Sequence, residues 1–120
     1  MLVHHDDIEL VAGDAWAIDG QLLDEDGTPL NLTSGVDLGW TLRGPDGRTV
    51  AGLIANGATL DKINPTGGGV VVNVPGTLTR DLPPGRYTDT IRVWTGGNPA
   101  QMWQGHILVA CDQFASDITL

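Results

Sequence analysis

The stretch VDLGWTLR at residues 36–43 alternates apolar and mostly polar side chains over eight positions. Its apolar positions are Val36, Leu38, Trp40 and Leu42. Because successive side chains of a β-strand point to opposite sides, these four residues share one face. The pattern predicts a strand with one face in a core and the other in solvent, and it makes Trp40 a predicted core residue.

Similar short apolar runs, separated by turn residues, lie on both sides of this strand. The 120 residues include 17 glycines and 7 prolines, which supply the frequent turns of an antiparallel β protein. Only the segment from Pro75 to Leu82 is expected to turn helically, and for one turn. Strands are expected at residues 8–11, 15–23, 48–54, 70–74, 87–94 and 101–110, with a short additional one at 58–63.

This spacing predicts one all-β domain over residues 1–120, an immunoglobulin-like antiparallel β-sandwich of about 7–9 short strands. The core is expected to span roughly residues 7–110, followed by a C-terminal tail at 111–120. Tyr87 follows the turn at 82–86 and begins a late strand. Sandwiches place a tyrosine corner there, with the hydroxyl bonded back to the preceding loop, so Tyr87 is expected to be a structural residue.

The apolar pattern also restricts the register of the last hairpin. Pairing Val93 with Trp103 puts both in the core and leaves a three-residue loop at 97–99. Asp89 then points inward, which requires a hydrogen-bonded partner or a position at a strand end. On the outer face, the same register places Trp94 opposite Met102, Arg92 opposite Gln104, and Thr90 opposite His106.

An exposed Trp–Met pair is unusual on a monomer, and both residue types are enriched in interfaces. Trp94, Met102, Arg92 and His106 are therefore candidate interface residues. The alternative is that a loop or the C-terminal tail covers the pair.

The net charge of −9 is concentrated in the first third of the chain. Residues 1–42 hold nine acidic and no basic residues, whereas the remainder is balanced. Such a surface repels phosphate backbones, so nucleic-acid binding is not expected. No apolar run approaches the roughly 18 residues of a membrane span, and no signal peptide is recognisable. The single cysteine, Cys111, excludes an internal disulfide and is expected to be a small apolar residue.

The sequence contains no recognisable metal or catalytic motif. Asp24-Glu25-Asp26-Gly27 resembles half of a calcium loop but lacks the later ligands, so an acidic turn is expected. His4, His5 and His106 would meet only if the N-terminus folded onto the last strand, and they are expected to be solvated. Neither Ser34 nor Ser116 has the setting of a nucleophile. We therefore expect no metal, no cofactor and no enzymatic activity.

Several segments resemble the immunoglobulin-like N-terminal domain of phage baseplate upper proteins, and small stand-alone proteins of the same pattern in tailed phages and prophages of proteobacteria. The resemblance extends over roughly residues 13–110. The segments that carry it are Gly13-Asp14-Ala15-Trp16, the stretch from Leu23 to Thr33, Trp40-Thr41-Leu42-Arg43 with Pro45-Asp46-Gly47, and Leu82-Pro83-Pro84-Gly85-Arg86-Tyr87 leading into Ile91-Arg92-Val93.

The resemblance implies a non-enzymatic virion protein, synthesised in the host cytoplasm, that contacts other virion proteins and copies of itself. Head decoration, a head–tail junction and a tail accessory are equally compatible with it. A homo-oligomer or a multi-copy assembly is expected. The alternative is an adhesion or carbohydrate-binding sandwich facing a host surface, in which Trp94 would stack on a sugar.

Overall fold

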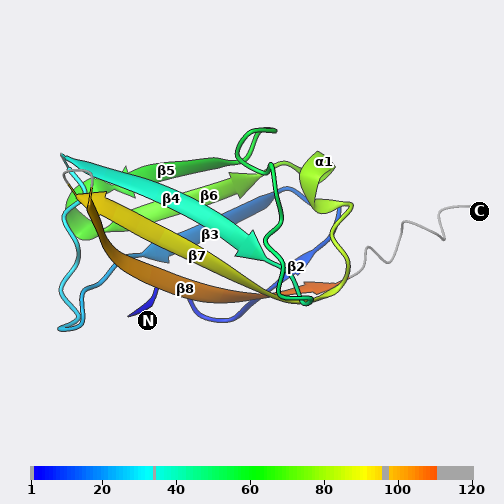
Figure 1. Ribbon diagram of the computed structural model, residues 1–120, viewed down its shortest axis with the longest axis horizontal. Coiled ribbons are helices and arrows are strands. Elements are labelled where there is room, and N and C mark those ends of the chain that lie inside the picture. The colour runs from blue at the N-terminus through cyan, green and yellow to red at the C-terminus, as the bar shows by residue number, and fades with distance from the viewer. Residues whose placement is uncertain (1, 34, 96–97, 111–120) are drawn as a thin grey trace, which may run out of the picture.

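The computed structural model describes residues 2–33, 35–95 and 98–110, with the backbone alone described at 98–101. Two β-sheets lie face to face in this part of the chain (Figure 1). The strands are β1 (Leu2–Val3), β2 (Ile8–Val11), β3 (Trp16–Gln21), β4 (Val36–Arg43), β5 (Thr59–Asn64), β6 (Gly69–Val74), β7 (Gly85–Thr95) and β8 (Asn98–Ala110); the helical turns are η1 (Pro65–Gly67) and α1 (Gly76–Thr79).

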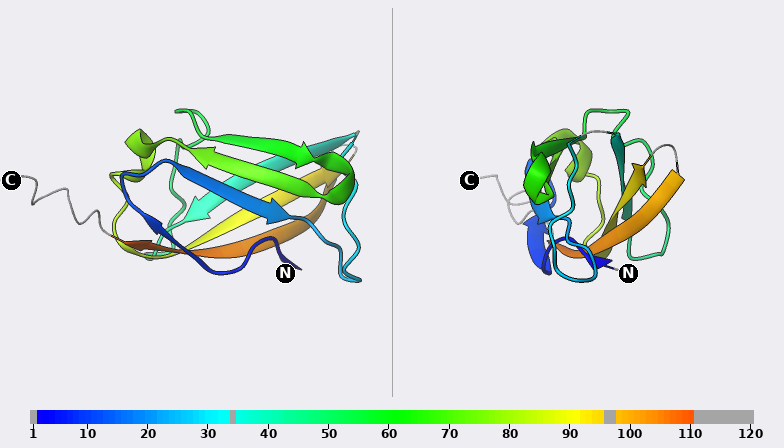
Figure 2. Two further views of the ribbon diagram at one scale, coloured as in Figure 1. Left: turned by 180° about the vertical axis from the view of Figure 1, so that it is seen from behind. Right: turned by 90° about the vertical axis from the view of Figure 1, so that its left-hand side faces the viewer.

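The strand order is that of an immunoglobulin-like sandwich. One sheet pairs β4, β7 and β8 antiparallel, and the short strands β1 and β2 both run parallel to β8 along its other edge. The other sheet has the order β3–β6–β5 and lies in front when the molecule is seen from behind (Figure 2). Two packed sheets of mainly antiparallel strands are the architecture of the immunoglobulin-like sandwich, so the predicted fold class is confirmed.

The core lies between the two sheets and is built from alternate residues of each strand. In β4, Trp40 and Leu42 are buried whereas Asp37, Thr41 and Arg43 are exposed, as the alternation in VDLGWTLR predicts. Trp103 of β8 has no exposed surface. Burying a large apolar side chain contributes about 1.5–3 kcal/mol to folding, so these residues dominate the stability of the sandwich.

The sequence placed the start of the core at about residue 7, but the fold begins earlier in the chain. Leu2 pairs with Trp103 in the parallel β1–β8 ladder and packs against the core. The backbone of His4 links the two sheets: its N–H donates to Gln104 O at 3.2 Å, and its carbonyl accepts from Gln21 N–H at 3.0 Å. The N-terminal segment, from β1 to β2 (residues 2–11), is therefore a structural part of the sandwich. The expected tail at 111–120 lies outside the described residues.

The last hairpin has a different register from the one expected. Trp103 pairs with Ile91, not with Val93, and the ladder shifts between Val93 and Trp94. The ladder continues to Thr95 paired with Asn98, where a three-residue loop at 97–99 was expected, and the bulge adds one further residue to the ladder. From Gly85 to Val93 the pairing is displaced by two residues, an even number, so the side chains of this part of β7 stay on the expected face. The observed pairs are Arg92 with Met102, Thr90 with Gln104, Thr88 with His106, and Trp94 with Pro99.

The returning strand expected at 48–54 is replaced by turns. A single bridge joins Arg43 to Thr49, and turns occupy residues 51–57. Gly52 and Gly57 adopt φ angles of 77° and 126°, which side-chain-bearing residues rarely adopt and a regular strand does not contain. The helical turn expected between Pro75 and Leu82 and the short strand near 58–63 are both present, as α1 and β5.

Tyr87 makes the hydrogen bond expected of a tyrosine corner. Its hydroxyl donates to Pro83 O at 2.6 Å, and its side chain is buried in the core. Burial raises the pKa of the Tyr87 hydroxyl, with a smaller contribution from the nearby charge of Asp46. The hydrogen bond fixes the turn that leads into β7.

We predict that Tyr87→Phe lowers the free energy of unfolding by about 1 kcal/mol, the usual contribution of one hydrogen bond. A larger loss is not expected, because the acceptor belongs to Pro83, which is an exposed residue. Urea denaturation of both proteins measures the difference. A denaturation midpoint equal to that of the wild type would show that this bond does not stabilise the fold.

Candidate functional site

The four candidate interface residues all lie on the outer face of the β4–β7–β8 sheet. Trp94, Arg92, Met102 and His106 are each half-buried. Arg92 Nη2 donates to Met102 Sδ at 2.7 Å, and His106 Nδ1 lies 3.3 Å from the Thr88 hydroxyl. The structure therefore brings these residues to one surface, although Trp94 does not stand opposite Met102 as expected.

Trp94 lies against the sheet because a glycine stands beside it. A Cβ atom on Gly39 of β4 would come within 2.7 Å of the Trp94 ring. The indole thus covers backbone that a side chain would otherwise occupy, an arrangement known to protect glycines in strands. One side of the ring is held by the sheet, and the remaining surface contributes to the outer face.

The two outer faces of the sandwich differ in charge. Arg43, Arg86 and Arg92 lie on the β4–β7–β8 face, together with Asp37 and Glu9. On the opposite face, two exposed carboxylates stand on either side of the same residue of β6: Asp19 of β3 and Asp61 of β5 both pair with Val71.

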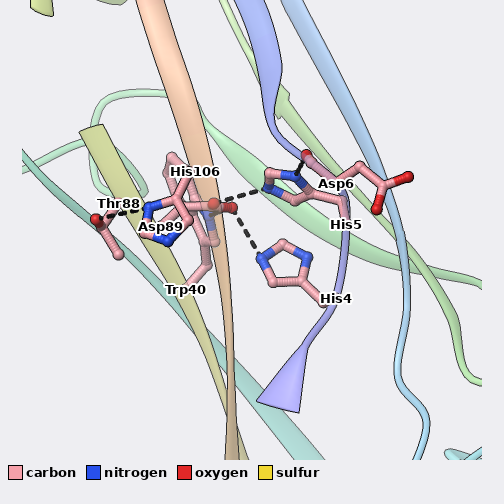
Figure 3. A network of polar contacts seen from close by, with 7 residues as sticks. All are labelled: His4, His5, Asp6, Trp40, Thr88, Asp89 and His106. Atoms are coloured by element: carbon pink, nitrogen blue, oxygen red, sulfur yellow. Dashed lines mark hydrogen bonds and ion pairs between the residues drawn. The ribbon is translucent and has the colours of Figure 1, made fainter. Parts of the chain in front are cut away.

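A second group of polar side chains lies inside the molecule, where the N-terminal segment crosses β8. His4 and His5 follow β1, and their rings point at Asp89 in the middle of β7 (Figure 3). Asp89 Oδ1 is 2.8 Å from His5 Nε2, and Asp89 Oδ2 is 3.0 Å from His4 Nε2. Trp40 Nε1 donates to Asp89 Oδ2 at 3.1 Å. We call His4, His5 and Asp89 the His–Asp cluster.

Two glycines provide the space that the cluster occupies. A Cβ on Gly105, which pairs with Asp89 across the sheet, would overlap the ring of His5. A Cβ on Gly20 of β3 would lie 2.7 Å from His4 Nδ1. Both sheets therefore lack a side chain where a histidine ring passes.

The hydrogen bonds of His5 determine its charge. Its Nδ1 lies 2.6 Å from Asp6 O and its Nε2 faces the Asp89 carboxylate, so both ring nitrogens meet acceptors and both must carry a proton. Burial lowers the pKa of His5, but the hydrogen bonds to Asp89 and Asp6 and the charges of Asp89 and Asp7 raise it overall. Burial raises the pKa of Asp89, and the two histidines more than reverse this, holding it well below its ordinary value.

His4 is less well satisfied than His5. Its side chain is 1% exposed, and its ring packs edge-on against His5 with centroids 4.3 Å apart. Although Nε2 is close to Asp89, it lies off the direction of a hydrogen bond, and neither ring nitrogen has a hydrogen-bond partner among the described residues. Unpaired buried polar groups cost about 1–3 kcal/mol each, so His4 is an exception that needs an explanation.

The expectation of solvated histidines is wrong for His4 and His5, because β1 and β2 fold onto β8. Only His106 stays on the outer face. One signal in the sequence pointed to the cluster: the pattern placed Asp89 inward, where it needs a partner. Asp89 also lies two residues after Tyr87, the position at which antibody domains carry a cysteine of their inter-sheet disulfide.

The acidic turn is present as expected. Asp24 Oδ1 accepts from the N–H groups of Asp26 and Thr28 at 2.9 Å, so this carboxylate is engaged by its own turn. Ser34, Ser116 and Cys111 lie outside the described residues. Among the described residues, no helix is long and apolar enough to cross a membrane.

Comparisons with known proteins identify the fold and no family. No family model matches the chain, and no curated protein matches it. Murine CRIg, an immunoglobulin-like domain, matches 92% of this chain and 97% of its own with a TM-score of 0.51 and 15% identity. A family 123 glycoside hydrolase from Clostridium perfringens, studied for glycolipid glycan hydrolysis, matches 90% of this chain with a TM-score of 0.54 and 13% identity, and the match spans 23% of its length. At these identities the likeness concerns the sandwich alone.

Replacing Asp89 with alanine is predicted to lower the free energy of unfolding by about 3–5 kcal/mol, because it leaves the protonated His5 and the Trp40 N–H buried without an acceptor. Asp61→Ala is the control, since that carboxylate is exposed on the other sheet and its loss changes stability little. Urea denaturation of the two variants makes the comparison. Equal stability of Asp89→Ala and Asp61→Ala would show that the cluster does not support the fold.

Proposed function

We propose that this chain is a non-enzymatic binding domain of a tailed bacteriophage particle, acting through protein–protein contacts on the outer face of its β4–β7–β8 sheet. The sequence resemblance to immunoglobulin-like phage domains supports the particle. The proposal covers head decoration, a head–tail junction and a tail accessory, which share this mode of action.

The observation that carries the binding role is the chemistry of this outer face. Trp94 and Met102 offer apolar surface beside the guanidinium of Arg92, and tryptophan, methionine and arginine are the residue types enriched where proteins meet. The face is built on three long paired strands, so its side chains are held in place before a partner arrives. Toward the β2 edge, Asp7, Arg86, His106 and Leu108 line a hollow of about 260 Å³.

A non-enzymatic role agrees with where the titratable groups lie. Among the described residues, pKa values are shifted for Tyr87 in the corner and for His5 and Asp89 in the His–Asp cluster, and the side chains of His5 and Asp89 are at most 5% exposed. A substrate has no access to groups buried in this way, because a catalytic acid or base must come within hydrogen-bond reach of the reacting atoms.

Copies of the chain are suitable partners for one another. The outer face carries Arg43 and Arg92, arginines that can pair with Asp19 and Asp61 on the opposite face of a second copy. Contact between unlike faces forms rings or stacks, which suits a component present in many copies. Such a contact weakens with salt, because the charges at its rim are screened.

Mass spectrometry of purified phage particles tests the proposed location, and a glycan array tests the carbohydrate-binding alternative. We expect the chain in the particles and no selective glycan binding. Absence from the particles together with strong binding to a defined glycan would replace the proposal with the adhesion role.

We predict that Thr41→Asp reduces self-association of the protein, measured by sedimentation velocity at low salt. Thr41 is exposed on β4, between Gly39 and Arg43 on the outer face, and an added carboxylate there is repelled by Asp19 and Asp61 of the facing copy. Thr77→Asp is the matched control, because Thr77 is exposed on α1, outside both sheets. Association that is equally affected by both substitutions, or by neither, would exclude this face as the contact.

A further inference from the structure

The His–Asp cluster has the ligand set of a transition-metal site. It offers one donor atom from each of two imidazoles and one carboxylate, and these atoms all lie within 4.8 Å of one another. Imidazole nitrogen and carboxylate oxygen are common ligands of Zn²⁺ and of other first-row divalent ions. His5 and Asp89 are far apart in sequence, so the fold creates this group and no local motif encodes it.

His5 is oriented as metal-binding histidines are. Such a histidine almost always donates its other ring N–H to a backbone carbonyl or a carboxylate, which fixes the tautomer and the direction of the ring. His5 Nδ1 makes this hydrogen bond to Asp6 O, and Nε2 is directed into the cluster. Trp40 Nε1 supports Asp89 in the same way, by donating to the carboxylate oxygen nearer His4.

The unpaired nitrogens of His4 are the independent observation that points to a ligand. His4 is buried, and its Nε2 is directed toward the cluster without a hydrogen bond among the described residues. A cation between the two histidines and Asp89 would give this nitrogen a partner. The absence of side chains at Gly20 and Gly105 makes room for the two rings beside Asp89.

The spacing of the donors is compatible with an ion. Tetrahedral bonds of roughly 2.0–2.2 Å separate neighbouring ligand atoms by about 3.3 Å. The two contacts with Asp89 measure 2.8 and 3.0 Å and involve its two carboxylate oxygens, while the whole donor set lies within 4.8 Å, so small movements of the side chains would bring the donors around one ion. The ion would take the place of the proton that His5 Nε2 otherwise directs at Asp89.

We propose that His4, His5 and Asp89 bind one divalent transition-metal ion, of which Zn²⁺ is the best suited, and that the ion fastens the N-terminal segment to β7. The ion would be buried, because the three side chains are at most 5% exposed, and a water molecule would complete its four-fold coordination. Asp89 stands where an antibody domain has one cysteine of its inter-sheet disulfide, in a chain whose single cysteine excludes an internal disulfide.

The experiment uses the full chain without a histidine tag, treated with a chelator and then dialysed. Isothermal titration calorimetry with ZnCl₂ measures stoichiometry and Kd, and Co²⁺ absorption reports the ligands. The test variants are His4→Gln and His5→Gln. The controls are His106→Gln, which removes the histidine of the outer face, and Cys111→Ser, which removes the thiol.

We expect one ion per chain and an unchanged Kd in both controls. Losing a residue that only supports a metal ligand weakens binding up to roughly 100-fold. Because His4 and His5 are proposed as ligands, we expect each test variant to lose more affinity than that. If a test variant does not fold, the wild type decides: Zn²⁺ must raise its melting temperature, Mg²⁺ must not, and the Co²⁺ spectrum must show tetrahedral nitrogen and oxygen ligation. The proposal fails if the wild type does not bind one ion, if both test variants bind as it does, or if a control loses binding.

Discussion

The buried carboxylate of Asp89 is the constraint on which the rest of this sandwich depends. A carboxylate without exposed surface needs donors around it, and β7 and β8 alone do not provide them, since Gly105 stands opposite. Trp40 in β4 and His5 in the N-terminal segment donate hydrogen bonds to this carboxylate, and His4 Nε2 lies 3.0 Å away. The fold can therefore bury Asp89 only if the first residues of the chain lie along β8.

This dependence gives the N-terminal segment its position. β1 and β2 are short, and few backbone hydrogen bonds hold each of them to β8. The histidines between them add a polar anchor with one correct alignment, because a shift of one residue would move both rings away from Asp89. Buried polar groups stabilise less than well-packed apolar ones but can select one register, and we infer that this is the role of the cluster with or without an ion.

Local patterns predicted the features that local residues determine. The alternation in VDLGWTLR identified β4 and its buried face, and the turn before Tyr87 identified the corner at the start of β7. The hairpin register was wrong because the ladder extends to Thr95 and Asn98 and has a bulge between Val93 and Trp94, and neither feature leaves a mark in an apolar pattern. The His–Asp cluster was missed because its partners are 84 residues apart, and the inward direction of Asp89 was its only sign. A pattern shows that a buried charge needs a partner, but only the tertiary fold shows which residue provides it.

The central claim, that Asp89 holds the N-terminal segment in place, is tested most directly by amide hydrogen exchange of the wild type and Asp89→Asn. The reporters are the His4 N–H, bonded to Gln104 O, and the Gln21 N–H, bonded to His4 O. The account predicts that both amides exchange much faster in the variant, whereas those of the β4–β7 ladder remain protected. Unchanged protection of His4 and Gln21 in Asp89→Asn would contradict it.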